Sequence, residues 1–485
     1  MTIEIFITLM FLMASIWVVF WAEKAKNPVG TVHMLFFVIF VTVLHLAGLF
    51  GDHERRLELS YYLLAHIVAF GYLALFALGM LCMREKRLAP SRERIFRTAV
   101  EFSNIWLIAA FSAWLIVKVY LVSKYGVSAF SLLRNMAGKD AVLHFYAWWE
   151  TPLEFYATAF AVGACGVFVI KATLEKGFWR KHWLVTMAFT AFTAVYVGTH
   201  SSIVGPRRFM LLLVLVGLVT IAWRDKKRVS KFVMSKWRIS LVAVIFLLGA
   251  AGYYQSIRNN FFQPDIGEQL LSGDPLTFAQ GVAQAMVPVP SSERVSAPSK
   301  YFREGPLSIV YEVIQKRGDG NPGTGGAITV NAFKSVIPRI IVGESKQDIN
   351  ADDFLNGQMG IAPAGPYLRS DVATSLLAIF LADFGYLGVL LAPMVMLFSL
   401  TMFAYIPRKG LLASPLLILY FFSALMNLSA NVEGSLVPIL STFRDAMILM
   451  LALLPFYLLR GLVLWRGPSL TRMQYRLRQQ RGKMV

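Results

Sequence analysis

The sequence has few charged residues for its length. Only 15% of its 485 residues are Asp, Glu, Lys or Arg, whereas 57% are hydrophobic and the mean hydropathy is +0.59. A soluble domain of this size could not bury so much apolar surface in a core. The composition therefore predicts an all-α polytopic integral membrane protein.

Cysteine is also scarce. The two cysteines, Cys82 and Cys165, both lie in apolar stretches, and the chain has neither a CxxC motif nor a Cys/His cluster. This excludes a disulfide framework and a thiolate metal site of the usual spacing. We do not expect redox chemistry.

Several motifs of soluble enzymes are missing. The chain contains no GxxxxGK[ST], HExxH or GxSxG motif and no GxGxxG motif in a strand-to-helix context. Nothing therefore indicates a nucleotide-phosphate site or a hydrolase nucleophile, and we expect no cofactor. His45 and His66 fall inside apolar runs without partners at metal spacing, so we interpret them as packed or hydrogen-bonded histidines.

Long apolar runs dominate what is present. Eleven segments are long enough to cross about 30 Å of hydrocarbon as helices. They lie near residues 3–21, 30–50, 61–82, 104–123, 153–173, 183–200, 208–223, 239–256, 387–406, 411–430 and 440–460. The first has no basic region before it and no small-residue cleavage site after it, so we expect a retained span.

The basic residues predict the orientation. Alternate connections between spans carry 28 Lys and Arg in short stretches, against 18 on the other side, of which ten lie in one very long segment. By the positive-inside rule the first set faces the cytoplasm. We expect a multi-pass protein of the bacterial inner membrane with a periplasmic N-terminus and a cytoplasmic C-terminus. The net charge of +19 is then explained by the basic residues that set the membrane orientation, and we expect no nucleic-acid partner.

Three regions follow from this topology: residues 1–256 with eight spans, 257–386 as a large outer segment, and 387–485 with three spans and a basic tail. The outer segment has Pro and Gly clusters separated by short amphipathic pieces. We expect one or two interfacial helices there, forming a lid on the bundle. The piece 371–387 is too short to span and is interpreted as an interfacial or re-entrant helix.

Five arginines lie at predicted outer ends of spans or in the outer segment: Arg207, Arg208, Arg258, Arg339 and Arg444. A guanidinium group is always ionised and binds phosphate oxygens through two parallel N–H groups, so converging arginines suit a lipid-linked phosphate or pyrophosphate. The alternative is that Arg207 and Arg208 extend to lipid head groups, while Arg444 pairs with Asp445 or Glu433.

Three stretches resemble the Wzy-type O-antigen polymerases, a family of oligosaccharide repeat-unit polymerases. GPRRFMLLLVLVG resembles the family's arginine-bearing helix start, and SVIPRIIVGESK resembles its Pro-Arg pair with a downstream lysine, here Pro338, Arg339 and Lys346. LADFGYLGVLL resembles its "acid or Asn, Phe-Gly, two residues, Gly" segment, here beginning at Asp383. The order of the stretches, the number of spans and the large outer segment agree with the family.

The resemblance implies a membrane glycosyltransferase of the GT-C-like architecture. Its donor and acceptor would be undecaprenyl-pyrophosphate-linked oligosaccharides, and a chain-length regulator protein is a possible partner besides membrane lipid. The arginines and Lys346 would bind pyrophosphate, and Glu433 or Asp383 would activate the acceptor hydroxyl. Each acid could instead be an arginine partner or a charge at a helix N-terminus.

Two other functions stay open. A glycosyltransferase using a polyprenyl-phosphate sugar would need a metal or base site in an outer loop, for which Asp52, His53 and Glu54 are the candidates. A flippase or transporter of lipid-linked glycans is the alternative from another class. Transporters are typically built from internal repeats with charges at mid-membrane, whereas here the charges lie at the outer edge and no repeat is visible.

Overall fold

The structure is a computed structural model. It describes residues 2–43, 45–46, 58–85, 92–125, 149–200, 206–224, 274–285, 306–337, 357–361, 375–405, 414–432 and 436–466, with residues 269 and 355. Every regular element in these ranges is helical, which confirms the all-α prediction.

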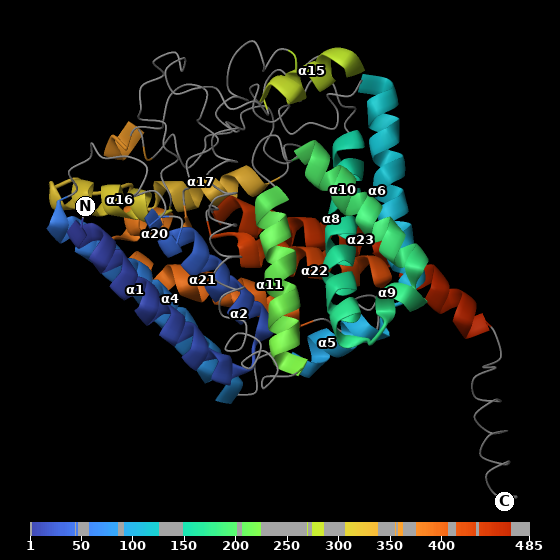
Figure 1. Cartoon of the computed structure of the whole chain (residues 1–485), viewed down its shortest axis with the longest axis horizontal. Helices are drawn as coiled ribbons and strands as arrows, with labels where there is room; N and C mark the ends of the chain where they lie inside the picture. Colours follow the sequence, from blue (N-terminus) through green and yellow to red (C-terminus); the bar gives the residue numbers. More distant parts are fainter. Residues whose placement is uncertain are drawn as a thin grey trace, which may run out of the picture.

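The first helices form one side of the bundle. They are α1 (Thr2–Ala22), the short η1 (Glu23–Ala25), α2 (Pro28–Phe37), which continues as the π-helical η2 (Val38–Val43), and α4 (Leu59–Glu85). Asn27 begins α2, because its side-chain oxygen accepts a hydrogen bond from the Gly30 amide at 3.1 Å and Pro28 occupies the first helical position. Figure 1 shows α1 and α4 side by side, and Thr8 of α1 lies 2.7 Å from the hydroxyl of Tyr62 in α4.

The central helices follow. These are α5 (Arg92–Glu101), α6 (Asn104–Tyr125), α8 (Glu150–Leu174), α9 (Phe178–Lys181), α10 (Trp183–His200) and α11 (Pro206–Arg224). Gly163 brings α8 close to a later helix, α22, since a Cβ there would lie 1.9 Å from the Leu419 carbonyl oxygen. Small residues allow membrane helices such close approach. Helix α8 therefore lies at the centre of the bundle.

Among the described residues, the segment 257–386 and the C-terminal part add seven helices. These are α15 (Pro275–Ala285), α16 (Pro306–Gly318), α17 (Ala327–Val336), α20 (Leu376–Phe384), α21 (Leu387–Ala404), α22 (Pro415–Ala430) and α23 (Leu436–Arg466). Figure 1 shows α15 at the top of the view, α16 and α17 below it near mid-height, and α5 at the bottom. We call the end of the bundle that carries α15, α16 and α17 the α17 end, and the end that carries α5 the α5 end.

The number of spans is confirmed in part. Six helices among the described residues are long and apolar enough to cross a membrane: Ile3–Ala25, Leu59–Met83, Asn104–Tyr125, Glu150–Leu174, Leu387–Ala404 and Leu436–Leu458. Four shorter apolar helices coincide with further predicted spans: Pro28–Val43, Trp183–Tyr196, Phe209–Arg224 and Pro415–Ala430. The predicted span at 239–256 lies outside the described residues, so eleven spans stay a prediction.

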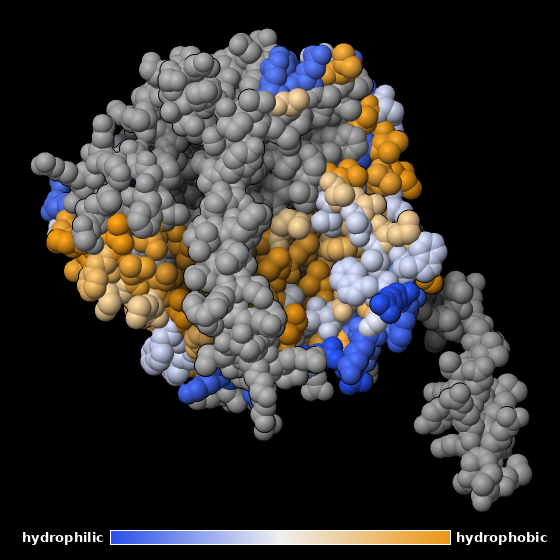
Figure 2. All heavy atoms as spheres, viewed as in Figure 1, coloured by the Kyte–Doolittle hydropathy of each residue, from blue (hydrophilic) through white to orange (hydrophobic). Residues whose placement is uncertain are grey.

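The surface has the apolar character of a membrane protein. Side chains such as Phe6, Trp17 and Phe20 of α1 are 63%, 67% and 71% exposed. Figure 2 shows apolar side chains across the middle of the visible face and hydrophilic ones near α5 and α9 at its lower edge. Such extensive exposed apolar surface indicates contact with lipid.

The outer segment differs from its prediction. We expected one or two helices lying on the surface, but three are described, and α16 is packed into the core. Its Leu307, Ile309, Val310 and Val313 side chains are at most 1% exposed. The cause is a continuous apolar face on α16 that packs against α4 and α20. The expected short helix in 371–387 is present as α20.

Candidate functional site

Asp383 holds the N-terminus of α17. Its side chain is buried, and Oδ1 accepts hydrogen bonds from the Ile328 amide at 3.2 Å and from the Thr324 hydroxyl. Oδ2 accepts from the Thr329 amide at 2.7 Å and from the Thr329 hydroxyl at 2.6 Å. Both oxygens thus bind donors in or just before the first turn of α17, where a negative charge is favoured. This geometry favours the interpretation of Asp383 as a charge at a helix N-terminus.

The residues after Asp383 form a tight corner between α20 and α21. Gly385 ends α20 with φ of +61°, a conformation that suits glycine. A Cβ on Gly388 would lie 2.1 Å from the Phe380 carbonyl oxygen. The Asp-Phe-Gly segment noticed in the sequence is therefore a structural corner, and its two glycines are required by backbone geometry.

Arg317 fixes the loop between α16 and α17 to the same corner. Its Nη2 donates to the Ala382 carbonyl at 2.7 Å, and the Thr324 amide donates to the same oxygen at 3.0 Å. Gly323 has φ of +83°, and a Cβ there would lie 2.4 Å from that oxygen. The sequence analysis did not identify Arg317, because only the folded chain brings residues 317 and 382 together.

Arg444 lies at the opposite end of α17. Its Nε donates to Asp445 Oδ1 at 2.8 Å, which confirms one of the two pairings considered above, and its Nη1 donates to the Val336 carbonyl at 3.3 Å. The Arg444 side chain is 33% exposed, whereas that of Asp445 is 10% exposed. Within the described ranges Nη2 has no hydrogen-bond partner. Two hydrogen bonds thus hold the guanidinium in place.

Arg207 and Arg208 lie in the first turn of α11, so the predicted helix start is confirmed. Helix α11 runs parallel to α8: a Cβ on Gly217 would lie 3.5 Å from Val169, and Arg224 Nη1 donates to the Thr173 carbonyl at 2.9 Å. The start of α8 is near Asp445, whose carbonyl accepts from the Tyr156 hydroxyl at 3.0 Å. The first turn of α11 therefore points to the α17 end, as Arg444 does.

Four other candidate residues lie outside the described residues: Arg258, Arg339, Lys346 and Glu433. The same holds for the alternative metal candidates Asp52, His53 and Glu54. The structure therefore brings Asp383 and Arg444 to one helix and leaves the convergence of the remaining arginines a prediction.

Two carboxylates, one of them buried, join α6 to α8. Glu150 is fully buried and accepts hydrogen bonds from Tyr120 and Tyr125 at 2.6 Å and from Lys124 at 2.7 Å. One turn further along α8, Glu154 pairs with Lys118. Charges inside membrane spans need such partners. These residues tie two spans together, and the sequence analysis did not single them out.

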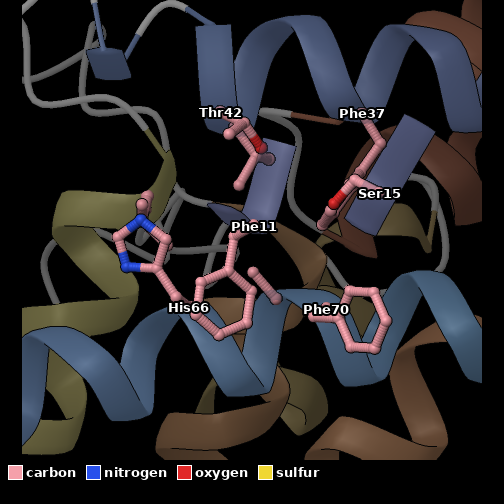
Figure 3. A pocket seen from close by; sticks show the side chains of 9 residues that line it. Phe11, Ser15, Phe37, Thr42, His66 and Phe70 are labelled. Carbon is pink, nitrogen blue, oxygen red and sulfur yellow. The ribbon is translucent and has the colours of Figure 1, made fainter. Parts of the chain in front are cut away.

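The histidine interpretation is confirmed. His66 lies 3.0 Å from the Tyr62 carbonyl through Nδ1 and 3.2 Å from Thr8 through Nε2, and His45 lies 2.9 Å from the Tyr62 hydroxyl. Figure 3 shows His66 beside Phe11 at a small cavity whose other walls include Ser15 and Thr42. These polar groups satisfy each other between α1, η2 and α4.

Within the described part of the chain, no group of three or more His, Cys, Asp or Glu side chains could hold a metal ion. Comparison of the chain with protein-family models, with characterised proteins and with solved structures gives no match.

Proposed function

We propose that the protein is a glycosyltransferase that polymerises undecaprenyl-pyrophosphate-linked oligosaccharide repeat units at the outer face of the bacterial inner membrane. The all-helical fold with several membrane-spanning helices supports a reaction on lipid-linked substrates. The resemblance of three stretches to Wzy-type polymerases supports the reaction class. The α17 end would be the periplasmic side.

The observation that carries the proposal is the hydrogen bond from Arg444 to the Val336 carbonyl, because it places Arg444 at the end of α17 that leads into Arg339 in the sequence. Arg339 follows Val336 by three residues, and three residues extend at most about 11 Å. The side chains of Arg444 and Arg339 can thus reach one phosphate group. The first turn of α11, with Arg207 and Arg208, points to the same end.

Such arginines would neutralise the leaving group. In the proposed reaction an acceptor hydroxyl attacks the anomeric carbon of the donor sugar, the bond from that carbon to the pyrophosphate oxygen breaks, and undecaprenyl pyrophosphate leaves. Fixed guanidinium groups stabilise the negative charge that develops on the pyrophosphate. A carboxylate takes the hydroxyl proton. Both oxygens of Asp383 are already occupied, which favours Glu433 over Asp383 as this base.

The test uses a strain from which the gene is deleted and which expresses either the parent protein or a variant. In the variants, Arg207, Arg208, Arg339 and Arg444 are replaced one at a time by Lys and by Ala. Glycan polymer length and protein abundance are measured together. Lysine keeps the positive charge but lacks the planar guanidinium that donates two parallel hydrogen bonds. We therefore expect each Lys variant to be nearly as damaging as the corresponding Ala variant. Each lost charge-assisted contact should cost roughly 1.5–3 kcal/mol, about one to two decades in rate.

Arg224 provides the matched control. It lies in the same helix as Arg207 and Arg208 but at the other end, the α5 end, where its side chain donates a hydrogen bond to the Thr173 carbonyl. Arg224→Lys should leave polymer length unchanged. Full-length polymer at normal abundance in all four Lys variants would contradict the pyrophosphate assignment. Single repeat units stranded on the cytoplasmic leaflet of the deletion strain would indicate a flippase instead.

A further inference from the structure

We infer that Asp383 is a positioning residue, which fixes α17 against the α20–α21 corner and thereby sets the location of the Val336 carbonyl that binds Arg444. The part that concerns Arg444 as a substrate-binding residue depends on the proposed function. The part that concerns α17 does not.

The contacts at the N-terminus of α17 come from one buried group. Asp383 is 4% exposed and binds two backbone amides and two threonine hydroxyls. The amides of a first helical turn have no partners within the helix, so an external carboxylate supplies what the helix lacks. Loss of the carboxylate would remove the acceptor of four donors, of which the Ile328 amide and the Thr324 hydroxyl are buried.

The support for Asp383 is rigid. Ser375 caps the N-terminus of α20, because its hydroxyl accepts a hydrogen bond from the Ala378 amide at 3.1 Å. Residues 376–383 of this helix are all buried. Arg317 and the Thr324 amide bind the Ala382 carbonyl, one residue before Asp383. The carboxylate therefore has a fixed position relative to α21 and to the loop that precedes α17.

A helix fixed at its N-terminus has a defined C-terminus as well. The ten residues of α17 extend about 15 Å at 1.5 Å per residue. The far end meets Arg444 through the Val336 carbonyl. Any shift of α17 is therefore passed to Arg444 through this hydrogen bond.

The experiment measures the opening of α17 by thiol labelling. Cys82 and Cys165 are replaced by Ala, and Ala332→Cys introduces one thiol on the buried face of α17, where Ala332 is 2% exposed. An impermeant maleimide should label this thiol slowly in the parent. Asp383→Ala should raise the labelling rate by about tenfold or more, since lost charge-assisted hydrogen bonds populate the open form.

Asp383→Asn should give an intermediate rate, because an amide keeps one accepting oxygen. Asp274→Ala is the matched control: it removes an aspartate from the N-terminus of α15 and should leave labelling at position 332 unchanged. If Asp383→Ala does not accumulate in the membrane, Thr329→Val removes one of the four hydrogen bonds and should give a smaller increase.

Polymer length at normal abundance is the second readout. Faster labelling with shortened polymer in Asp383→Ala, and partial recovery of length in Asp383→Asn, is the expected result. Unchanged labelling, or faster labelling with full-length polymer, would overturn the positioning role. If the parent protein makes no polymer in the deletion strain, the proposed function fails, and the labelling result alone decides whether Asp383 holds α17.

Discussion

Helices α15 and α17 both lie between residues 257 and 386, and an aspartate accepts hydrogen bonds at the N-terminus of each, but the two aspartates lie at different places in the sequence. Asp274 immediately precedes α15 and accepts from the Thr277 amide at 2.8 Å and the Thr277 hydroxyl at 2.7 Å while exposed to solvent. Asp383 is buried and lies 54 residues beyond Thr329 in the chain. A local cap stabilises only its own helix, whereas a distant one also fixes where the helix lies.

The largest expected difference in the free energy of unfolding is between the Asp383→Ala and Asp274→Ala variants. Asp383→Ala should lower the free energy of unfolding by about 3 kcal/mol, because it leaves several buried donors unsatisfied. Asp274→Ala should leave global thermal unfolding unchanged, since water can replace an exposed carboxylate. Tryptophan fluorescence during heating in nanodiscs measures both. Equal melting temperatures for the two variants would remove the distinction.

Glycine substitutions in the loop before α17 test whether the corner supports Asp383. Gly323 and Gly320 both have positive φ, of +83° and +92°, but only Gly323 faces the Ala382 carbonyl and Arg317. Gly320→Ala should cost about 1 kcal/mol from backbone strain alone. Gly323→Ala should cost about 2 kcal/mol more, because the new methyl group displaces Arg317. Similar melting temperatures for these variants would contradict the tight corner.

Threonine substitutions give a finer test of the two aspartates. Thr329→Val keeps the shape of the side chain but removes one donor to Asp383, and should destabilise the protein by about 1.5 kcal/mol. Thr277→Val removes the equivalent donor to Asp274 and should affect only α15. Hydrogen exchange of the α15 and α17 amides measures the two effects separately. An increase in α17 exchange caused by Thr277→Val would show that the helices are coupled.

The smallest expected effect is a dependence of α15 on pH. The Thr277 hydroxyl and amide hold the pKa of Asp274 below its ordinary value of 3.8. The folded-state pKa is thus lower than the unfolded one, so the cap contributes fully above about pH 4 and is lost as pH falls through the folded pKa. A spin label on α15 should gain mobility as the pH falls through the folded-state pKa of Asp274, below 3.8. The Asp274→Asn variant should show no such transition.

The helices were predictable because each is a continuous apolar run with a local signal. All ten predicted spans that fall within the described residues coincide with helices, including the α11 start at Pro206. The pairing of Arg444 with Asp445 was also predictable, because the two residues are adjacent. These features depend on neighbouring residues alone.

The role of Asp383 could be proposed only as one of two alternatives. Its partners, Ile328 and Thr329, lie more than fifty residues earlier, and no local pattern links them. The contact of Arg317 with Ala382 is hidden for the same reason. The burial of α16 also depends on distant partners in α4 and α20, so its amphipathic pattern was interpreted as that of a surface helix.

The distance in sequence between α17 and Asp383 has a consequence for biosynthesis. A ribosome adds about 5–20 residues per second, so α17 is synthesised roughly 3–10 s before Asp383. During that interval the first turn of α17 has no carboxylate partner, and α20 and α21 are not yet available to receive it. The outer segment can therefore adopt its final arrangement only after the last group of helices begins to insert. A nascent chain halted before residue 383 should keep α17 accessible to protease, and one halted after α21 should protect it.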